Sequence, residues 1–252
     1  MGGDLDLAGV TVVLPALDEA AALPAALASF PAGVDLVVVD NGSTDGTAAV
    51  AAALGVRVVS EPRRGFGAAC WAGVQASPQA RVLAFADADG SLDGADLAVV
   101  AGPVLRDEAD LVLGSRVRGH RDPGALSGLA LAENLVLGAA CGLLFGVRLS
   151  DLGPFRAVRR DLLVRLGISD RGQGWPLEMV GRAALAGLRV VEVPVRYHRR
   201  AAGHSKVAGS LTGSLHAAAH MTRVTARLLG ERAAGRLPGP MTLRSPADRE
   251  VG

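Results

Sequence analysis

The feature that most constrains this chain is a regular alternation between short apolar, β-branched runs and alanine-rich segments. The apolar runs contain no regular polar positions, which is typical of strands buried on both faces of a sheet. Strands are predicted at residues 10–14, 35–39, 56–59, 82–86 and 110–114, and crossover helices at 19–29, 47–54, 67–76 and 95–106. The pattern predicts an α/β fold with a mostly parallel central sheet flanked by helices.

The alternation ends after Gly114, and the second half of the chain follows a looser pattern. That half predicts strands at 155–158 and 188–197 and helices at 160–166 and 176–186. Half of the 252 residues are hydrophobic, so the chain is large enough to bury a sizeable core. We expect one main domain at 1–208, an amphipathic C-terminal helix at 209–234 and a disordered tail at 235–252.

The net charge and the number of cysteines indicate which binding partners and which cellular compartment to expect. Lys and Arg number 26 against 25 Asp and Glu, so a net charge of +1 gives no general attraction to nucleic acid. Cys70 and Cys141 lie far apart among small apolar residues, which favours core packing over a disulfide or a zinc site. The first residues show no basic segment before an apolar run, so we predict no secretory signal and a cytoplasmic protein.

The longest apolar stretch, 125–147, is interrupted by Glu133 and Asn134 and by several glycines. Because charged groups at the centre of a membrane span are unfavourable, we do not expect a transmembrane helix there. Two arrangements remain open for this stretch. Its helices either pack within the protein or lie peripherally at the inner face of the membrane.

Acidic residues follow two of the predicted strands. Asp87 and Asp89 come directly after the strand at 82–86, and two carboxylates at this spacing can converge on one divalent cation. An isolated pattern of this kind is also typical of a solvated turn. Here, however, Asp40 ends an earlier strand, and the 15–19 loop follows the first one. Ligands in open α/β sheets bind beyond the carboxyl ends of the strands, so these residues are predicted to line one crevice.

Two basic groups suit phosphate chemistry. The first falls within eleven residues after the last apolar strand and comprises Arg196, His198, Arg199, Arg200, His204 and Lys206. Such a loop can close over a diphosphate and neutralise developing charge, although it is also typical of a solvated surface. Lys206 is the only lysine in the chain, which suggests a chemical reason for a compact ammonium. In the second group, Arg116 is the phosphate-binding candidate, whereas Arg118 and Arg121 are expected on the surface.

Two further carboxylates are candidate bases. Glu178 lies in the first turn of a predicted helix, where it either takes a proton and holds a substrate or simply favours the helix N-terminus. Asp151 leaves the same choice open, because it either orients a substrate or caps the turn at Gly153.

Seven segments together resemble one known family. They occur in order at 13–19 (VLPALDE), 38–47 (VVDNGSTDGT), 64–69 (RGFGAA), 87–91 (DADGS), 113–116 (LGSR), 151–157 (DLGPFRA) and 203–206 (GHSK). The chain resembles the family 2 glycosyltransferases of the dolichol-phosphate mannose synthase-like group. The resemblance implies a GT-A type fold, a requirement for Mg²⁺ or Mn²⁺, and inversion at the anomeric carbon of a transferred hexose.

The resemblance also implies roles for individual residues. It places the nucleotide among Pro15, Ala16, Asp18, Asp40 and Arg64. It gives metal binding to Asp89 and ribose or metal binding to Asp87, acceptor phosphate binding to Arg116, and stabilisation of the leaving diphosphate to Arg200 and Lys206. One position departs from the pattern, since Ser91 stands where relatives with a polyprenyl-phosphate acceptor often carry Gln.

Several alternatives stay open at the level of function. The acceptor of the sugar from a nucleotide diphosphate sugar is either a polyprenyl phosphate at the membrane surface or a small hydroxyl compound. A phosphate acceptor is already an anion, whereas a hydroxyl needs Glu178 or Asp151 as a base. A non-catalytic nucleotide-sugar-binding partner subunit is a third possibility, and the presence of Asp87, Asp89 and Arg200 argues against it.

Overall fold

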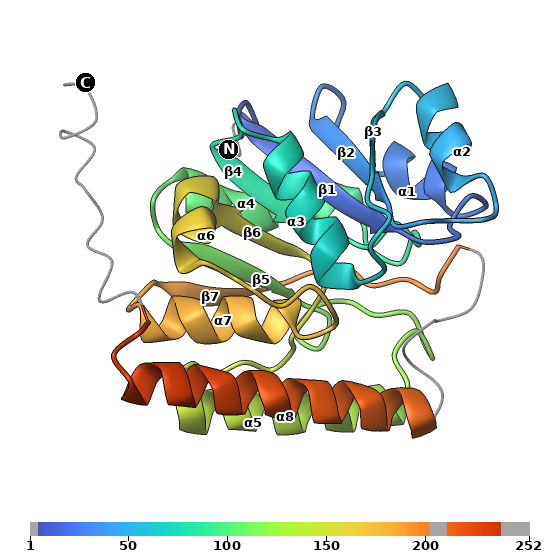
Figure 1. The fold of residues 1–252 in the computed structure, drawn as a ribbon. Coiled ribbons are helices and arrows are strands. Elements are labelled where there is room, and N and C mark those ends of the chain that lie inside the picture. The colour runs from blue at the N-terminus through green and yellow to red at the C-terminus, as the bar shows by residue number, and fades with distance from the viewer. Residues whose placement is uncertain (1–4, 202–210, 238–252) are drawn as a thin grey trace, which may run out of the picture.

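The protein is built around a seven-stranded sheet in the order β3-β2-β1-β4-β6-β5-β7 (Figure 1). The structure is a computed structural model that describes residues 5–201 and 211–237, with only the backbone described at 211–219. The strands are β1 (Val10–Ala16), β2 (Asp35–Asp40), β3 (Arg57–Ser60), β4 (Val82–Phe85), β5 (Leu111–Ser115), β6 (Arg156–Arg159) and β7 (Val190–Pro194). Each predicted strand has an observed counterpart, and the last one is shorter than predicted.

The prediction of a mostly parallel sheet is confirmed, with β6 as the exception. Strands β1 to β4 pair in parallel, as do β5 and β7, whereas β6 is antiparallel to both of its neighbours. Arg156, the first residue of β6, therefore pairs with Phe85 at the end of β4 and with Leu113 near the end of β5. The reversed direction of β6 brings Arg156 to the edge of the sheet where β4 and β5 end.

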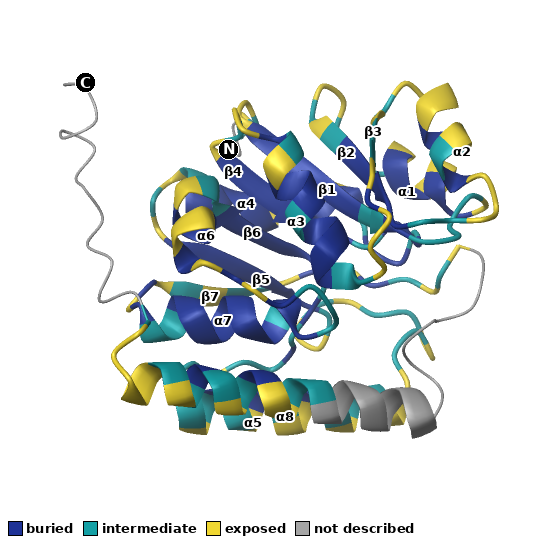
Figure 2. Ribbon diagram, viewed as in Figure 1, coloured by how far each residue is buried: buried dark blue, intermediate teal, exposed yellow. Residues whose placement is uncertain are grey.

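Alternating strand residues feed two hydrophobic cores, one on each face of the sheet (Figure 2). Val13 and Leu83 belong to the core shared with α3, α6 and α7, whereas Val12 and Ala84 belong to the core shared with α1 and α4. The helices are α1 (Leu23–Ala28), α2 (Thr47–Ala53), α3 (Phe66–Ala76), α4 (Leu97–Leu105), α5 (Gly128–Phe145), α6 (Arg160–Leu166), α7 (Trp175–Leu185) and α8 (Leu211–Ala233). Burial on both faces explains why the strands read as continuous apolar runs.

Two predicted helices begin later than expected. Helix α1 starts at Leu23 rather than at residue 19, because residues 18 and 19 belong to a turn: the Asp18 N–H donates to Ser43 in the loop after β2, and the Glu19 N–H donates to Thr47 at the start of α2. The helix predicted at 95–106 starts with the 3₁₀ turn η1 (Gly94–Asp96) before α4 continues. In both cases the hydrogen bonds of a turn replace the first turn of an α-helix.

Helices α5 and α8 form a layer outside α7 (Figure 1). Both helices meet at Gly181 of α7, where an added Cβ would lie 2.7 Å from Leu228 Cδ1 and 3.2 Å from Phe145 Cζ. Helix α8 closely matches the predicted C-terminal helix, and its residues Val224 and Leu228 pack into the core. The C-terminal part of the predicted tail, 238–252, lies outside the described residues.

Helix α5 contains the long apolar stretch and is only partly covered. Ser127 caps its N-terminus by accepting a hydrogen bond from the Ala130 N–H, and Gly146 ends it in the left-handed conformation. Among the described helices, α5 alone is long and apolar enough to cross a membrane, with 22% of its residues buried. Its most exposed large side chains are Leu143, Leu135 and Val136, at 86%, 73% and 67%.

Candidate active site

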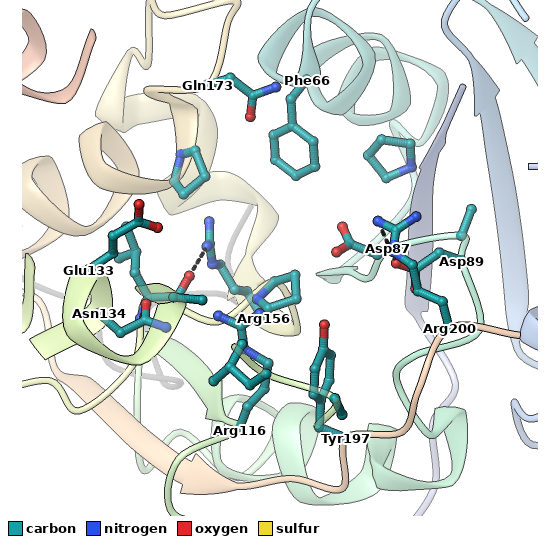
Figure 3. Close-up of a pocket in the computed structure, with 18 of the residues that line it drawn as sticks. Phe66, Asp87, Asp89, Arg116, Glu133, Asn134, Arg156, Gln173, Tyr197 and Arg200 are labelled. Atoms are coloured by element: carbon teal, nitrogen blue, oxygen red, sulfur yellow. Dashed lines mark hydrogen bonds and ion pairs between the residues drawn. The ribbon is translucent and has the colours of Figure 1, made fainter. Parts of the chain in front are cut away.

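A pocket of about 580 Å³ lies at the carboxyl ends of the parallel strands, where open α/β sheets bind their ligands. Its wall combines the ends of β1 and β4, the residues after β5, the N-terminal half of α5 and the segment after β7. Figure 3 shows Asp87, Asp89 and Arg200 at one end, Glu133 and Asn134 at the other, and Arg116 and Arg156 between them. The pocket therefore carries acidic and basic groups along its length.

Asp89 is almost fully enclosed, at 2% exposure, and each of its oxygens has its own partner. Ser91 donates both its backbone N–H and its hydroxyl to Asp89 Oδ1, at 2.9 and 2.6 Å. Arg200 Nη2 lies 2.9 Å from Asp89 Oδ2. Ser91 is itself fully buried, and its hydroxyl group donates to Asp89 rather than facing the pocket. Ser91 orients this carboxylate.

Asp87 lines the pocket beside Asp89. Burial and the negative charge of Asp89 raise the pKa of Asp87 to about 6, although Arg116, Arg200 and Arg156 act in the opposite direction. The three arginines therefore do not fully offset burial and the charge of Asp89, and the ionised form of Asp87 is disfavoured in the chain without a metal ion. A cation at this position would relieve the repulsion between the two carboxylates.

These carboxylates fit a metal ion that arrives with a phosphate-bearing ligand. In the described part of the chain, no three His, Cys, Asp or Glu side chains are grouped closely enough to hold a metal ion by themselves. Mg²⁺ is commonly held by one or two carboxylates together with substrate phosphates and water. Asp87 and Asp89 would supply the carboxylates, as the sequence predicts.

The residues predicted around a nucleotide come to this edge of the sheet, but only some of them line the pocket. Pro15 and Ala16 do so, at the end of β1. Asp18 instead accepts hydrogen bonds from the backbone N–H and the hydroxyl of Thr44, at 2.6 and 3.2 Å. Its backbone is in the left-handed region, with φ of 49°. Asp18 therefore joins the loop after β1 to the loop after β2.

Asp40 and Arg64 are likewise absent from the pocket wall. Asp40 ends β2 and accepts a hydrogen bond from the Ser43 N–H at 3.1 Å. Arg64 is exposed and lies against Gly42, where an added Cβ would be 3.4 Å from Arg64 Nε. Both side chains border the 41–46 loop, and their predicted contacts with a nucleotide remain predictions.

Asn41 lines the pocket but was not selected from the sequence. Its Nδ2 donates to the carbonyl oxygens of Glu61 and Arg63, at 2.9 and 2.7 Å, and its Oδ1 accepts from the Gly65 N–H at 2.8 Å. The side chain thus ties the end of β2 to the loop after β3. In the sequence, the only indication of this role is an amide side chain placed directly after a strand, where a buried amide needs hydrogen-bond partners.

Arg200 is carried to the pocket by backbone hydrogen bonds. The His198 N–H donates to the Ser91 carbonyl at 2.8 Å, and the Ala201 N–H donates to the Asp89 carbonyl at 3.2 Å. Arg200 consequently reaches Asp89 and also lies 3.5 Å from Glu19 Oε1. The turn that holds the carboxylates therefore also positions this arginine.

Among the described residues of the basic group after β7, Arg200 alone lines the pocket. Arg196 pairs with Asp93 and Asp96, at 2.7 and 2.6 Å, and Arg199 donates to the Pro123 carbonyl. His204 and Lys206 lie outside the described residues, so the predicted role of Lys206 stays a prediction.

Arg116 lines the pocket as predicted and is held from behind by Asp151. Its Nε and Nη2 donate to the two oxygens of Asp151, both at 2.8 Å, and its guanidinium carbon lies 5.1 Å from the centre of the Tyr197 ring. Asp151 is fully buried. The structure therefore makes Asp151 the residue that orients Arg116, rather than a base facing the pocket.

Glu178 does not line the pocket, and its predicted role as a base stays a prediction. It is fully buried in α7. Its Oε1 accepts from Arg182 Nε at 2.6 Å, and its Oε2 accepts from Arg227 Nη2 and the Asp170 N–H, both at 2.7 Å. A carboxylate with this many donors on both oxygens is a structural anion. These partners lie elsewhere in the chain, so the helix pattern alone could not reveal them.

Other pocket residues were not assigned a role from the sequence. Glu133 and Asn134, which interrupt the apolar stretch, belong to the part of α5 that lines the pocket. Arg156 lies within the 151–157 segment and lines the pocket from the start of β6, while Gln173 and Phe66 face it from the opposite wall (Figure 3). The polar interruption of α5 thus marks the turn of the helix that meets the pocket.

Comparisons with known proteins agree with this geometry. The model of the family described as Glycosyl transferase family 2 matches residues 11–163. An uncharacterised glycosyltransferase of Mycobacterium tuberculosis is 46% identical over 217 residues, which are 85% of this chain and 95% of the relative. The undecaprenyl-phosphate mannosyltransferase of Micrococcus luteus is 31% identical over 248 residues, covering 89% of this chain and 98% of the relative.

A solved structure shares the fold. The glucosyl-3-phosphoglycerate synthase of Mycobacterium tuberculosis, in complex with Mn²⁺, uridine-diphosphate-glucose and phosphoglyceric acid, superposes with a TM-score of 0.67. The match covers 88% of this chain and 79% of that protein, at 26% sequence identity. The chain is therefore similar to proteins of the GT-A type.

Proposed function

Because this chain belongs to glycosyl transferase family 2, in its dolichol-phosphate mannose synthase-like group, we propose that it transfers a hexose to a polyprenyl phosphate at a membrane surface. It is a glycosyltransferase with a GT-A type fold and a nucleotide-sugar donor. The lipid acceptor, the need for Mg²⁺ or Mn²⁺ and inversion at the anomeric carbon are parts of the proposal.

The end of the pocket near β4 supplies what a nucleotide diphosphate requires. Asp87 and Asp89 would hold the metal ion, which when bound neutralises charge on the diphosphate. Arg200 lies within reach of Asp89 and would stabilise the departing diphosphate. Lys206 is proposed to act with Arg200. Pro15 and Ala16 line the pocket here and would contact the nucleotide. Asp18, Asp40 and Arg64 lie around the 41–46 loop outside the pocket wall, and we propose that they contact the rest of it.

The observation that carries the choice of acceptor is the state of the two candidate bases. Asp151 and Glu178 are both fully buried and engaged by arginines on both of their oxygens. Neither faces the pocket, so an acceptor hydroxyl would need another base, such as Glu133 in the pocket wall. An acceptor phosphate is already an anion and needs no base to attack the anomeric carbon. This supports a phosphate acceptor.

The residues around the pocket support a lipid as the acceptor of the sugar. The far end of the pocket is built by α5, and Leu129, Leu135, Val136 and Leu143 of this helix are exposed. An exposed run of apolar side chains marks a surface that contacts a partner or a membrane. The relative from Micrococcus luteus is named for an undecaprenyl-phosphate substrate. A small water-soluble acceptor is the second candidate, since the solved structure with the same fold holds phosphoglyceric acid.

The test is transfer from a panel of nucleotide sugars, with Mn²⁺ or Mg²⁺, to undecaprenyl phosphate in vesicles and to water-soluble acceptors. We expect a glycosyl lipid phosphate whose anomeric configuration, measured by NMR, is opposite to that of the donor. Asp89→Ala should abolish transfer and remove the metal dependence of donor binding. Transfer to water-soluble acceptors alone would establish the second candidate, and donor binding without any transfer would indicate a partner subunit.

A further inference from the structure

Arg156 is a nearly enclosed cation in the wall of the pocket. Its side chain is 3% exposed. Its Nε donates to the Gly153 carbonyl at 2.7 Å, and its Nη2 donates to the Leu152 carbonyl at 2.9 Å. Among the described residues, it forms no ion pair with a carboxylate, and its Nη1 makes no hydrogen bond. Figure 3 shows the guanidinium group directed into the pocket.

The contrast with Arg116 shows what Arg156 lacks. The charge of Arg116 is met by both oxygens of Asp151 at 2.8 Å. The direct contacts of Arg156 are two neutral carbonyl groups, and the carboxylates of Asp87 and Asp151 act on its charge only from beyond ion-pair distance. Burial lowers the pKa of Arg156 to about 10, which still leaves it charged at neutral pH. A buried charge without a counter-charge in direct contact is unfavourable, and such groups concentrate at binding sites.

The ligand that suits such a group is an anion with several acceptor oxygens. A guanidinium group presents its N–H donors in a planar fork that matches phosphate and carboxylate geometry. In Arg156, the two carbonyl contacts fix the plane of the group and leave Nη1 for the ligand. A phosphate there would place a negative charge in direct contact with the guanidinium group.

The position of Arg156 assigns this anion to the acceptor rather than to the donor. Asp87, Asp89 and Arg200 lie at one end of the pocket, and Arg156 lies between them and α5 (Figure 3). The antiparallel β6 delivers it there, since Arg156 pairs with Phe85, two residues before Asp87. In a displacement with inversion, the nucleophile must lie across the sugar from the leaving diphosphate.

We propose that Arg156, together with Arg116, forms a subsite for the phosphate monoester of the acceptor. This inference rests on the proposed function and adds a residue and a charge requirement to it. Arg116 is positioned by Asp151, and Arg156 contributes a positive charge that has no carboxylate in direct contact among the described residues. The chemistry recognised is a monophosphate, which is shared by a polyprenyl phosphate and by a small phosphorylated acceptor.

The experiment measures binding rather than turnover. Isothermal titration of the full chain without donor or metal would use farnesyl phosphate, glycerol 3-phosphate, inorganic phosphate and uncharged farnesol. Arg156→Met should weaken the binding of the monophosphates at least tenfold. Arg118→Met is the matched control, because it removes one positive charge near the pocket from a side chain that is 54% exposed. The control should change monophosphate affinity less than twofold.

The different ligands distinguish a lipid phosphate from a small phosphorylated acceptor, and they test the subsite separately from the proposed function. Arg156-dependent binding of farnesyl phosphate alone identifies a lipid, and equal binding of glycerol 3-phosphate identifies the headgroup as sufficient. Arg156→Lys keeps the charge and serves as the second variant if Arg156→Met does not fold, with an affinity between wild type and Met. Titration of nucleoside diphosphates with Mn²⁺ tests the proposed function separately and should be unaffected by Arg156→Met. Unchanged monophosphate affinity in both variants, or equal binding of farnesol and farnesyl phosphate, would overturn the subsite.

Discussion

At the scale of single residues, the two oxygens of Asp89 serve different partners. Oδ1 is held by Ser91, and Oδ2 is left to face Arg200 and the pocket. Hydrogen bonds to charged groups contribute about 1.5–3 kcal/mol, so losing the Ser91 hydroxyl should disturb the carboxylate measurably. Ser91 does not line the pocket, so we expect it to act on a ligand only through Asp89.

We expect Ser91→Ala to weaken Mn²⁺-dependent binding of a nucleotide sugar roughly tenfold, because Asp89 keeps only the backbone donor. Calorimetric titration with and without Mn²⁺ measures this. Ser77→Ala is the control, since the Ser77 hydroxyl is also buried but makes no hydrogen bond. If both variants bind the donor as tightly as the wild type does, Ser91 has no part in orienting Asp89.

Asp87 makes the opposite kind of contribution, since it disfavours folding of the metal-free chain. Its pKa is raised from 3.8 to about 6, so the folded chain resists ionisation of this carboxyl. The penalty is absent below about pH 4, where the group is protonated in both states, and is complete above about pH 6. Stability is therefore lost as the pH rises through this window.

Asp87→Asn should accordingly stabilise the metal-free chain at pH 8 and stabilise it only about a third as much near pH 4.5, where the carboxyl of the unfolded chain is already mostly ionised. A shift of this size corresponds to at most about 3 kcal/mol. Urea unfolding of both chains at the two pH values, in the presence of a chelator, measures the difference. A variant that is less stable than the wild type at pH 8 would show that the attraction of Asp87 to nearby arginines outweighs its burial.

At the scale of elements, Glu178 joins α7 to α8 and to the segment before α7. Arg182 from α7, Arg227 from α8 and the Asp170 N–H all donate to it. Removing one partner of a buried ion pair leaves an uncompensated charge, and such changes cost about 3–5 kcal/mol. That is a large share of the stability of a typical domain.

Glu178→Gln should therefore lower the free energy of unfolding by about 3–5 kcal/mol while the folded enzyme keeps its kcat. Urea unfolding, together with activity per folded molecule, separates the two effects. Glu108→Gln is the control, because its ion pair with Arg106 is exposed to solvent and should contribute little to stability. A loss of kcat without a loss of stability would restore Glu178 as a catalytic residue.

The elements also show how far the sequence could be interpreted. The strands could be predicted because burial on both faces produces local apolar runs. Asp89 and Arg116 could be placed near the pocket because each lies just after the end of such a strand. The partner of Glu178 on α8 lies 49 residues away, and local pattern cannot find it. The same holds for Arg156, whose place in the pocket depends on the antiparallel direction of β6. Pairings between distant segments decide which charged residues face the ligand.

At the scale of the whole molecule, the pocket and the outer helical layer meet at α5. The N-terminal half of this helix lines the pocket, and Leu135, Val136 and Leu143 are exposed on it. A lipid acceptor whose phosphate lies near Arg156 would have its chain close to this helix. The arrangement suggests that α5 contacts the membrane from which the acceptor is taken.

A variant carrying Leu135→Gln, Val136→Gln and Leu143→Gln should bind vesicles at least tenfold more weakly than the wild type. Full burial of one such side chain is worth about 1.5–3 kcal/mol, so partial burial of three exceeds the 1.4 kcal/mol that tenfold represents. Flotation with vesicles of phosphatidylcholine and phosphatidylglycerol measures the binding. Leu54→Gln with Val164→Gln is the control, because these side chains are also exposed, at 49% and 41%, but lie on other elements. The α5 variant should also lose transfer to undecaprenyl phosphate in vesicles while retaining its affinity for the nucleotide donor. If flotation is unchanged and the wild type sediments as a dimer that the variant cannot form, the face binds a second copy of the chain instead.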